Sequence, residues 1–511
     1  MVESLPIDGP TYHPGDELKR FPELESKHVT SRTLRRPINS MTRDIKLIEL
    51  GAVAAAEAIR KGAFTAEHYA TVLLDRSEQL ARLNAFITID RNTVLHAARE
   101  ADAAVARHDI LGALHGIPIA VKDNIDVASM PATAGTSSLR NNVPKVDAQL
   151  VARLRAAGAI VLGKTNMHEL AAGITTDNAT FGAALNPYDE GRVPGGSSGG
   201  TAAAVGARLA PIGIGTDTGA SNRLPAAFCG VVGFRPTTGR WPQAGLIPNS
   251  PTRDTAGPMA RTVEDCALID SIVTGDDDWL EPVNLPTLRF GIPRRYCWSD
   301  LDPAIASLAQ DWLGRMRDAG ITLIEAEIPG IQELTTLAGM PIGVFEHEAA
   351  LSSYLAQAGS PLSFADVLSG VEGPDVKAFF EEMRSRITED DYRAALDVHR
   401  PHLQQAYRSY FSQHEVDAII FPTTPLLAPT LEEVRDATGG RALSIMMRAI
   451  RNTDPGSIAG IPGISIPGGV SLSGMPAGLE LDGPAGSDRR LLKVASAVAR
   501  LLPATPPPPI G

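Results

Sequence analysis

Residues 191–223 read GRVPGGSSGGTAAAVGARLAPIGIGTDTGASNR, and this glycine- and serine-rich stretch decides the fold assignment. Its middle predicts a helix over 199–209 followed by a strand over 210–215. A helix of this length carries the chain about 15 Å outward, and the strand returns it a similar distance. Ser197 and Ser221, on either side of these elements, are therefore expected to meet. Glycines around both serines let backbone N–H groups approach a bound molecule closely.

Other interpretations of this stretch compete. A phosphate loop needs a lysine that GGSSGGTAAA lacks. A dinucleotide fingerprint fails because Gly213, Gly215 and Gly219 have the wrong spacing. A flexible Gly/Ser linker fits poorly, because apolar segments flank the motif on both sides. Residues 196–200 match the nucleophile elbow G-x-S-x-G with Ser198 as nucleophile, but that turn needs a strand before it, and NPYDEGRVPG is typical of a loop.

A serine nucleophile requires a base that accepts its proton, and no histidine lies near these loops in the sequence. Lys122 ends the apolar run GIPIAVK (116–122). A lysine at the end of a buried strand is desolvated, which lowers its pKa and lets the neutral amine act as a base. The competing interpretation is that Lys122 only ends the strand and pairs with Asp123.

Strand-like runs alternate with helical stretches along the rest of the chain, which predicts an α/β protein with a largely buried sheet. The expected strands cover 116–122, 159–164, 210–215, 288–293, 321–328, 416–422 and 477–482. The expected helices cover 65–80, 92–107, 148–157, 199–209, 262–274, 303–319 and 486–501. A further helical pattern begins at Thr42, and Thr65 is a candidate N-cap.

The chain divides by composition into three parts. Residues 1–43 are polar and poorly periodic and are interpreted as an N-terminal arm. Residues 44–502 are interpreted as a single domain, and 503–511 as a Pro-rich tail. Residues 330–440 are more helical and more charged than the rest, and we expect them to form a lid or a specificity insertion.

Composition excludes several classes of protein. The 511 residues carry a net charge of −12, which argues against binding to nucleic acid or to an anionic membrane. Three scattered cysteines do not make a disulfide framework or a zinc site. No secretory signal and no long apolar run are visible, so we expect a soluble, cytoplasmic protein. A homodimer is considered only because twofold oligomers are common.

Three long segments together resemble the amidase signature family. They are GIPIAVKDNIDVASMPATAGTSSL (116–139), VLGKTNMHELAAGITTDNATFGAALNPYD (161–189) and GGSSGGTAAAVGARLAPIGIGTDTGASNRLPAAFCGVVGFRPTTGRW (195–241). The resemblance is continuous over about 110–270, with weaker matches at DAIIFPTTPLLAP and AIRNTDPGSIAGIPGISIPGG. It implies an α/β fold with a large twisted mixed sheet and helices on both faces.

The resemblance also implies a Ser–cisSer–Lys triad. By this match Ser221 is the acylated nucleophile, Ser197 relays its proton and Lys122 is the base. The family's cis peptide bond falls at Gly196–Ser197. The implied oxyanion hole consists of the backbone N–H groups of Thr218, Gly219, Ala220 and Ser221. The expected supporting residues are Ser198, Asp217 and Arg223, the last two as a charged brace.

The sequence departs from the family pattern at two positions. Where the family usually has GGSIR or GGSVR, this chain has GASNR (219–223). Ala220 would be strained if the site needs a positive φ. Asn222 brings an amide that must find partners if buried. His168-Glu169 lacks the second histidine of a HExxH zinc motif, so we expect it on a helix surface or in packing.

The implied activity is hydrolysis of the C–N bond of small hydrophobic amides, with neither a metal nor an organic cofactor. The segments GFRPTTGRW and AIRNTDPGS look most like indoleacetamide and mandelamide hydrolases, so aryl-containing substrates are expected, with esters or carbamates tolerated. Two alternatives remain open. One is a non-catalytic pseudo-amidase that binds an amide-like ligand or a partner. The other is an amidotransferase subunit acting on charged tRNA, which the acidic net charge disfavours.

Overall fold

The computed structural model describes residues 46–278, 281–437 and 440–510. The expected N-terminal arm, residues 1–43, therefore lies outside the described residues. Contacts group Asp44–Gly511 into one unit. Within it, the expected Thr65 cap is confirmed, because its side chain accepts a hydrogen bond from the N–H of His68 at 3.0 Å.

Eleven strands form one mixed sheet in the described part of the chain. Strands β2, β3 and β4 run parallel near one end, where β1 pairs antiparallel with β3 at the edge, and β7, β8 and β9 run parallel at the other end. The strands between these two groups are antiparallel. The order across the sheet is β1 (Phe86–Thr88), β3 (Ile160–Thr165), β2 (Pro118–Lys122), β4 (Ile212–Asp217), β6 (Thr255–Ala260), β5 (Val232–Arg235), β10 (Gly463–Val470), β11 (Pro476–Asp482), β9 (Ala418–Pro422), β7 (Arg289–Ile292) and β8 (Thr322–Glu325).

Helices cover both faces of this sheet. Strands β2, β3, β4, β6, β9 and β11 are buried at every position, so side chains on both of their faces are covered. The expected α/β fold with a mixed sheet is confirmed. The helices are α2 (Ala52–Arg60), α3 (Ala66–Gln79), α4 (Arg91–Ala106), α5 (Gln149–Ala156), α6 (Gly199–Gly206), α7 (Arg223–Phe228), α8 (Val263–Thr274), α9 (Arg294–Cys297), α10 (Pro303–Asp318), α11 (Ile331–Gln357), α12 (Phe364–Ser369), α13 (Pro374–Arg386), α14 (Glu389–Ala394), α15 (Arg400–His414), α16 (Leu431–Arg435), α17 (Gly440–Ile450), α18 (Asp454–Ala459) and α19 (Asp488–Ala499).

Helix α6 links the two serine-bearing loops. All eight of its residues are buried, as expected for a helix of small apolar residues enclosed on every side. It is shorter than the expected 199–209, because Arg208 has a φ of 59° and leaves the helical conformation. The chain then enters β4 at Ile212, so the predicted helix–strand pair is confirmed with a shorter helix.

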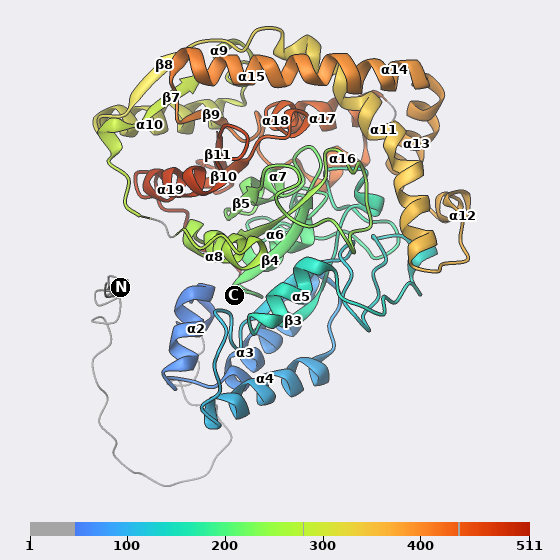
Figure 1. The fold of residues 1–511 in the computed structure, drawn as a ribbon, viewed down its shortest axis with the longest axis vertical. Coiled ribbons are helices and arrows are strands. Elements are labelled where there is room, and N and C mark those ends of the chain that lie inside the picture. The colour runs from blue at the N-terminus through green and yellow to red at the C-terminus, as the bar shows by residue number, and fades with distance from the viewer. Residues whose placement is uncertain (1–45, 279–280, 438–439, 511) are drawn as a thin grey trace, which may run out of the picture. The chain divides into compact units, whose positions relative to one another are not determined.

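Helices also fill the chain between β8 and β9. There α11 contacts α13, α14 and α15, and Figure 1 shows α11, in yellow, beside the orange α14 and α15. At the C-terminal end, residues 503–510 form neither helix nor strand. Two hydrogen bonds hold this segment, from Tyr188 Oη to the Pro506 carbonyl at 2.7 Å and from Gly469 N to Thr505 Oγ1 at 3.2 Å, and Ile510 packs against the core.

Candidate active site

Lys122 lies at the end of β2, between β3 and β4, and its side chain is fully buried. Its ammonium nitrogen Nζ donates to Ser197 Oγ at 2.8 Å and to Thr216 Oγ1 at 2.7 Å. The alternative that it pairs with Asp123 is wrong, since Asp123 forms its ion pair with Lys164 at 3.3 Å. The end of β2 therefore places the Lys122 amine in contact with the loop that carries Ser197.

The surroundings of Lys122 favour the neutral amine. Burial lowers the pKa of Lys122 to about 7, and the negative charges of Asp217 and Asp254 oppose this shift only in part. A lysine with this pKa is about half neutral at neutral pH, so it can accept a proton from a hydrogen-bonded hydroxyl.

The Gly196–Ser197 peptide bond is cis, as the family resemblance implies. Ser198 fastens this loop to β4: its Oγ donates to the Thr216 carbonyl at 3.0 Å, and it accepts from Thr216 N at 3.3 Å. Its backbone N–H donates to the Ser221 carbonyl at 3.2 Å, which joins the two serine loops. The nucleophile-elbow interpretation is wrong, because the Ser198 hydroxyl is buried and no strand precedes it.

Ser221 lies in the loop between β4 and α7. Its exposed fraction is 8%, whereas Lys122 and Ser197 are 0% exposed. Of the three residues expected to form the triad, Ser221 is thus the one that a molecule from outside can reach.

Hydrogen bonds fix the orientation of the peptide groups in this loop. The Gly219 carbonyl accepts from Arg223 Nη2 at 3.1 Å, and the Ala220 carbonyl accepts from Leu224 N at 2.8 Å. Because a trans peptide holds its N–H opposite its carbonyl, the N–H groups of Ala220 and Ser221 point away from these partners.

Ala220 carries none of the backbone strain that the sequence left open, because its φ is not positive. Its side chain lies in an apolar cluster with Ile174, Leu224 and Phe228. The extra methyl group is therefore part of an apolar wall beside Ser221.

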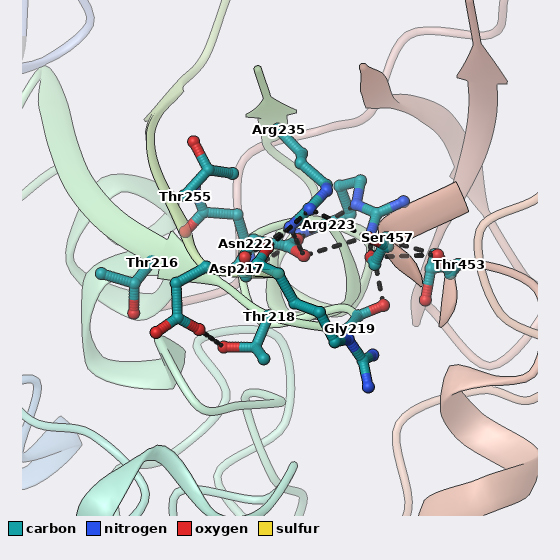
Figure 2. A network of polar contacts seen from close by, with 12 residues as sticks. Thr216, Asp217, Thr218, Gly219, Asn222, Arg223, Arg235, Thr255, Thr453 and Ser457 are labelled. Carbon is teal, nitrogen blue, oxygen red and sulfur yellow. Dashed lines mark hydrogen bonds and ion pairs between the residues drawn. The ribbon is translucent and has the colours of Figure 1, made fainter. Parts of the chain in front are cut away.

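Asp217 is the centre of the charged network in Figure 2. Its carboxylate accepts from Arg223 Nε at 3.0 Å and Nη2 at 3.1 Å, and from Arg235 Nη1 at 3.1 Å. Arg223 Nη2 also donates to Ser457 Oγ at 2.6 Å. These contacts fit the expected brace, and they add Arg235 and Ser457, which the sequence did not suggest.

The brace stays ionised despite its burial. Burial alone would raise the pKa of Asp217, but Arg223 and Arg235 together hold that pKa well below its usual range. Two further carboxyl groups approach Arg223 from β11, with Glu480 Oε1 at 3.1 Å and Asp482 Oδ1 at 3.9 Å from Nη1. Burial raises the pKa of both, with Arg223 opposing, so this carboxyl pair retains a proton near neutral pH.

Asn222 is fully buried and finds partners for its amide nitrogen only. Its Nδ2 donates to the Phe234 carbonyl at 3.3 Å, while Oδ1 has no partner in the described part of the chain. A Cβ on Gly215 would lie 2.2 Å from that oxygen, so glycine in β4 makes room for this amide.

His168 and Glu169 are both buried, so the expectation of a helix surface is wrong and that of packing is right. His168 Nε2 lies 3.1 Å from Asp375 Oδ2, and Glu169 Oε2 accepts from Gly373 N at 2.8 Å. His168 N also donates to the Ser197 carbonyl at 3.0 Å. These residues connect the Ser197 loop to the start of α13.

A cavity of about 640 Å³ is lined by residues between 172 and 179 and by residues of α13, α16 and α17, and neither Ser197 nor Ser221 is among the lining residues. A Cβ on Gly196 would lie 2.7 Å from the carbonyl carbon of Ile174, so the Ser197 loop packs against a residue that lines the cavity. Ile174 also packs in the cluster that contains Ala220. Most of the lining is apolar: Ala172, Gly173, Ile174, Thr175, Asp177, Ala179, Pro374, Asp375, Ala378, Phe379, Val434, Arg435, Ala437, Ala442, Leu443, Ile445 and Met446.

The described residues include no cluster of three or more His, Cys, Asp or Glu side chains that could hold a metal ion. Among the helices that the structure describes, none has both the length and the apolar character needed to cross a membrane.

Comparison with known proteins settles the family. Residues 70–492 match the family described as Amidase. The chain belongs to the amidase family. It is an amide-hydrolysing enzyme, and the expected resemblance is confirmed.

Individual relatives agree with this assignment. The chain is 40% identical over 450 residues to an indoleacetamide hydrolase of Agrobacterium vitis, covering 87% of this chain and 96% of the relative. It is 38% identical over 482 residues to a mandelamide hydrolase of Pseudomonas putida, covering 90% and 93%. The native peptide amidase from Stenotrophomonas maltophilia superimposes with a TM-score of 0.79 at 29% identity, covering 90% of this chain and 98% of that one.

Proposed function

We propose that this amidase hydrolyses small hydrophobic, aryl-containing amides through an acyl-enzyme on Ser221. Ser221 Oγ attacks the amide carbon while its proton passes through Ser197 to Lys122. The backbone N–H groups of Thr218, Gly219, Ala220 and Ser221 stabilise the oxyanion.

The second half of the reaction returns the proton. The leaving nitrogen takes it back along the same path and departs as ammonia or an amine, so the C–N bond breaks as the acyl ester remains. Water then attacks the ester, gives a proton to the same relay and releases a carboxylic acid. Each proton accepted by Lys122 is thus returned within one turnover.

The observation that carries this proposal is the 2.8 Å hydrogen bond between Lys122 Nζ and Ser197 Oγ in a fully buried setting. If Lys122 only ended a strand, its contacts with two buried hydroxyl groups, those of Ser197 and Thr216, and its lowered pKa would have no role in the reaction. The hydrogen bond between Ser198 N and the Ser221 carbonyl brings the Ser221 loop to the same place.

The substrate class rests on the cavity lined by Ile174, which packs in the same apolar cluster as Ala220, the residue before Ser221. Its mostly apolar lining and its volume of about 640 Å³ suit an aryl group better than a charged one. Two relatives are named for indoleacetamide and mandelamide, which both carry an aryl group. We assign the residues of α13, α16 and α17 that line the cavity as the specificity wall, and we expect esters and carbamates of similar shape to be tolerated.

Fluorophosphonate labelling tests the proposed nucleophile. The purified protein is treated with the reagent, and the modified residue is mapped by peptide mass spectrometry. We expect an adduct on Ser221 that is absent from Lys122→Ala, together with ammonia release from indoleacetamide and mandelamide. Ser221→Ala, which removes one oxygen atom, is the matched control. An adduct on any other serine would contradict the assignment, and the absence of hydrolysis over a broad amide panel would contradict the substrate class.

A further inference from the structure

Asp254 stands directly before β6 and was not among the residues expected from the sequence. It is almost fully buried, and its carboxylate accepts three hydrogen bonds. Thr218 Oγ1 donates to Oδ1 at 2.5 Å, and the N–H groups of Asn249 and Ser250 donate to Oδ2 at 2.8 and 2.9 Å. Figure 2 shows the Thr218 hydroxyl joined by a dashed line to this carboxylate. Burial raises the pKa of Asp254, and these three donors oppose that shift because they stabilise the ionised carboxylate.

A second buried carboxylate holds the same loop from its other side. Glu346 of α11 accepts from Ser250 Oγ at 2.7 Å and from Thr252 Oγ1 at 2.8 Å. The loop from 249 to 254 is therefore fixed between two carboxylates. Of these two, Asp254 is the one that contacts the loop carrying Ser221.

The charge of Asp254 is also less compensated than the other charges around Lys122. On β4, Asp217 is paired with Arg223 and Arg235. On β2 and β3, Asp123 and Lys164 pair with each other, and α6 carries no charged residue.

Asp254 itself makes no ion pair with any described residue, and Arg235 of β5 is the cation that acts on it through space. Its negative charge favours the protonated form of Lys122. Asp254 therefore acts on two parts of the site. It accepts a hydrogen bond from the Thr218 hydroxyl, and its negative charge interacts electrostatically with the Lys122 amine.

We infer that Asp254 is a positioning residue of the reaction with two separable effects: its hydrogen bond to Thr218 holds the loop 218–221, and its carboxylate, two residues before the β6 position that pairs with Thr216, acts on the Lys122 amine that contacts Thr216. This inference rests on the proposed role of Lys122 as the base. A carboxylate that was merely structural would produce the first effect without the second.

Three variants separate these effects. Asp254→Asn removes the charge and keeps one oxygen for Thr218, while its amide nitrogen replaces the oxygen that accepts from the N–H groups of Asn249 and Ser250. Thr218→Val removes the hydrogen bond and keeps the charge. Glu346→Gln, the matched control, removes a buried charge on the far side of the same loop. For each variant kcat and kcat/KM for indoleacetamide hydrolysis are measured across the pH range, and folding is checked by thermal unfolding.

We expect Asp254→Asn to move the acidic limb of kcat/KM to lower pH, because the neutral amine then persists further below the wild-type pKa of about 7. Thr218→Val is expected to lower kcat by about 10-fold or more through misplacement of the oxyanion loop, with the limb unmoved. Glu346→Gln is expected to leave the limb unmoved as well. If Asp254→Asn does not fold, Asp254→Ser removes the same charge and is expected to give the same shift.

If the acidic limb of the kcat/KM profile does not move in a folded Asp254→Asn or Asp254→Ser variant, the inference is overturned. An equal shift in Glu346→Gln or Thr218→Val would also overturn it, because loosening of the loop would then explain the effect. Failure of the proposed function looks different: a wild-type enzyme without an acidic limb, or an active Lys122→Gln variant, would remove Lys122 as the base whatever Asp254 does.

Discussion

The strongest prediction concerns how the rate depends on pH. Burial lowers the pKa of Lys122 to about 7 from an ordinary value of 10.5. At about pH 8 such a lysine is about 90% neutral, whereas one with the ordinary pKa is about 0.3% neutral, a difference of about 300-fold in available base. The neutral fraction falls to about 10% at about pH 6 and to about 1% at about pH 5. We therefore expect kcat/KM to rise about tenfold per pH unit below neutrality and to level off above about pH 8.

The assay is ammonia release from indoleacetamide at substrate concentrations well below KM, in buffers of constant ionic strength. Lys122→Arg is the matched control, since arginine keeps the positive charge and hydrogen-bond donors but does not deprotonate in this range. We expect this variant to lose about 10³-fold or more in kcat at every pH. A flat profile between about pH 6 and 10, or a limb centred on the ordinary lysine pKa, would refute the reasoning.

Three further outcomes follow from the brace and the cavity. Burial raises the pKa of Glu480 and Asp482, so the folded chain keeps a proton that the unfolded chain releases above about pH 4.5. The free energy of unfolding is therefore expected to fall as pH rises through neutrality. Glu480→Gln should reduce this fall, measured by urea titrations at about pH 5.5 and 8.5. An unchanged slope would argue against the retained proton. Met446→Trp should lower kcat/KM for indoleacetamide by about tenfold while a small aliphatic amide is affected much less, and equal losses for both would place the aryl group elsewhere. Asp217→Asn leaves Arg223 with a weakened partner in a buried site, which should cost about 3–5 kcal/mol of unfolding free energy by chemical denaturation; a loss below about 1 kcal/mol would contradict the brace.

The sequence predicted the central helix–strand pair because it depends on local patterns, whereas the approach of Lys122 to Ser197, 75 positions away, was expected only from the family resemblance. Four of the strands in the sheet were not predicted from the sequence. Strands β1 and β5 are only three and four residues long, so they offer too little periodicity. Strands β6 and β10 contain Pro258 and Pro467 together with glycines, which a strand pattern normally excludes.

The residues missed in the site share a different cause. Asp254 contacts Thr218 across 36 positions, and His168 reaches Asp375 in a helix far along the chain. Neither partner is marked by a motif, and only the folded chain shows which carboxylate meets which donor. Supporting residues inside the family motif, such as Asp217 and Arg223, could be named from the sequence, whereas those outside it, such as Asp254 and Asp375, could not.

The pairing of Arg223 with late parts of the chain affects the order in which the enzyme can become active during synthesis. Lys122, Ser197 and Ser221 have all been made when the first half of the chain leaves the ribosome. Arg223 then still lacks Ser457 at 2.6 Å and Glu480 at 3.1 Å, which are 234 and 257 positions further on. A nascent or truncated chain therefore contains Lys122, Ser197 and Ser221 but lacks the residues that hold Arg223, and with it the loop of Ser221, in place. We therefore expect hydrolytic activity to appear only after β11 has joined the sheet, and a chain that ends before β11 to be inactive.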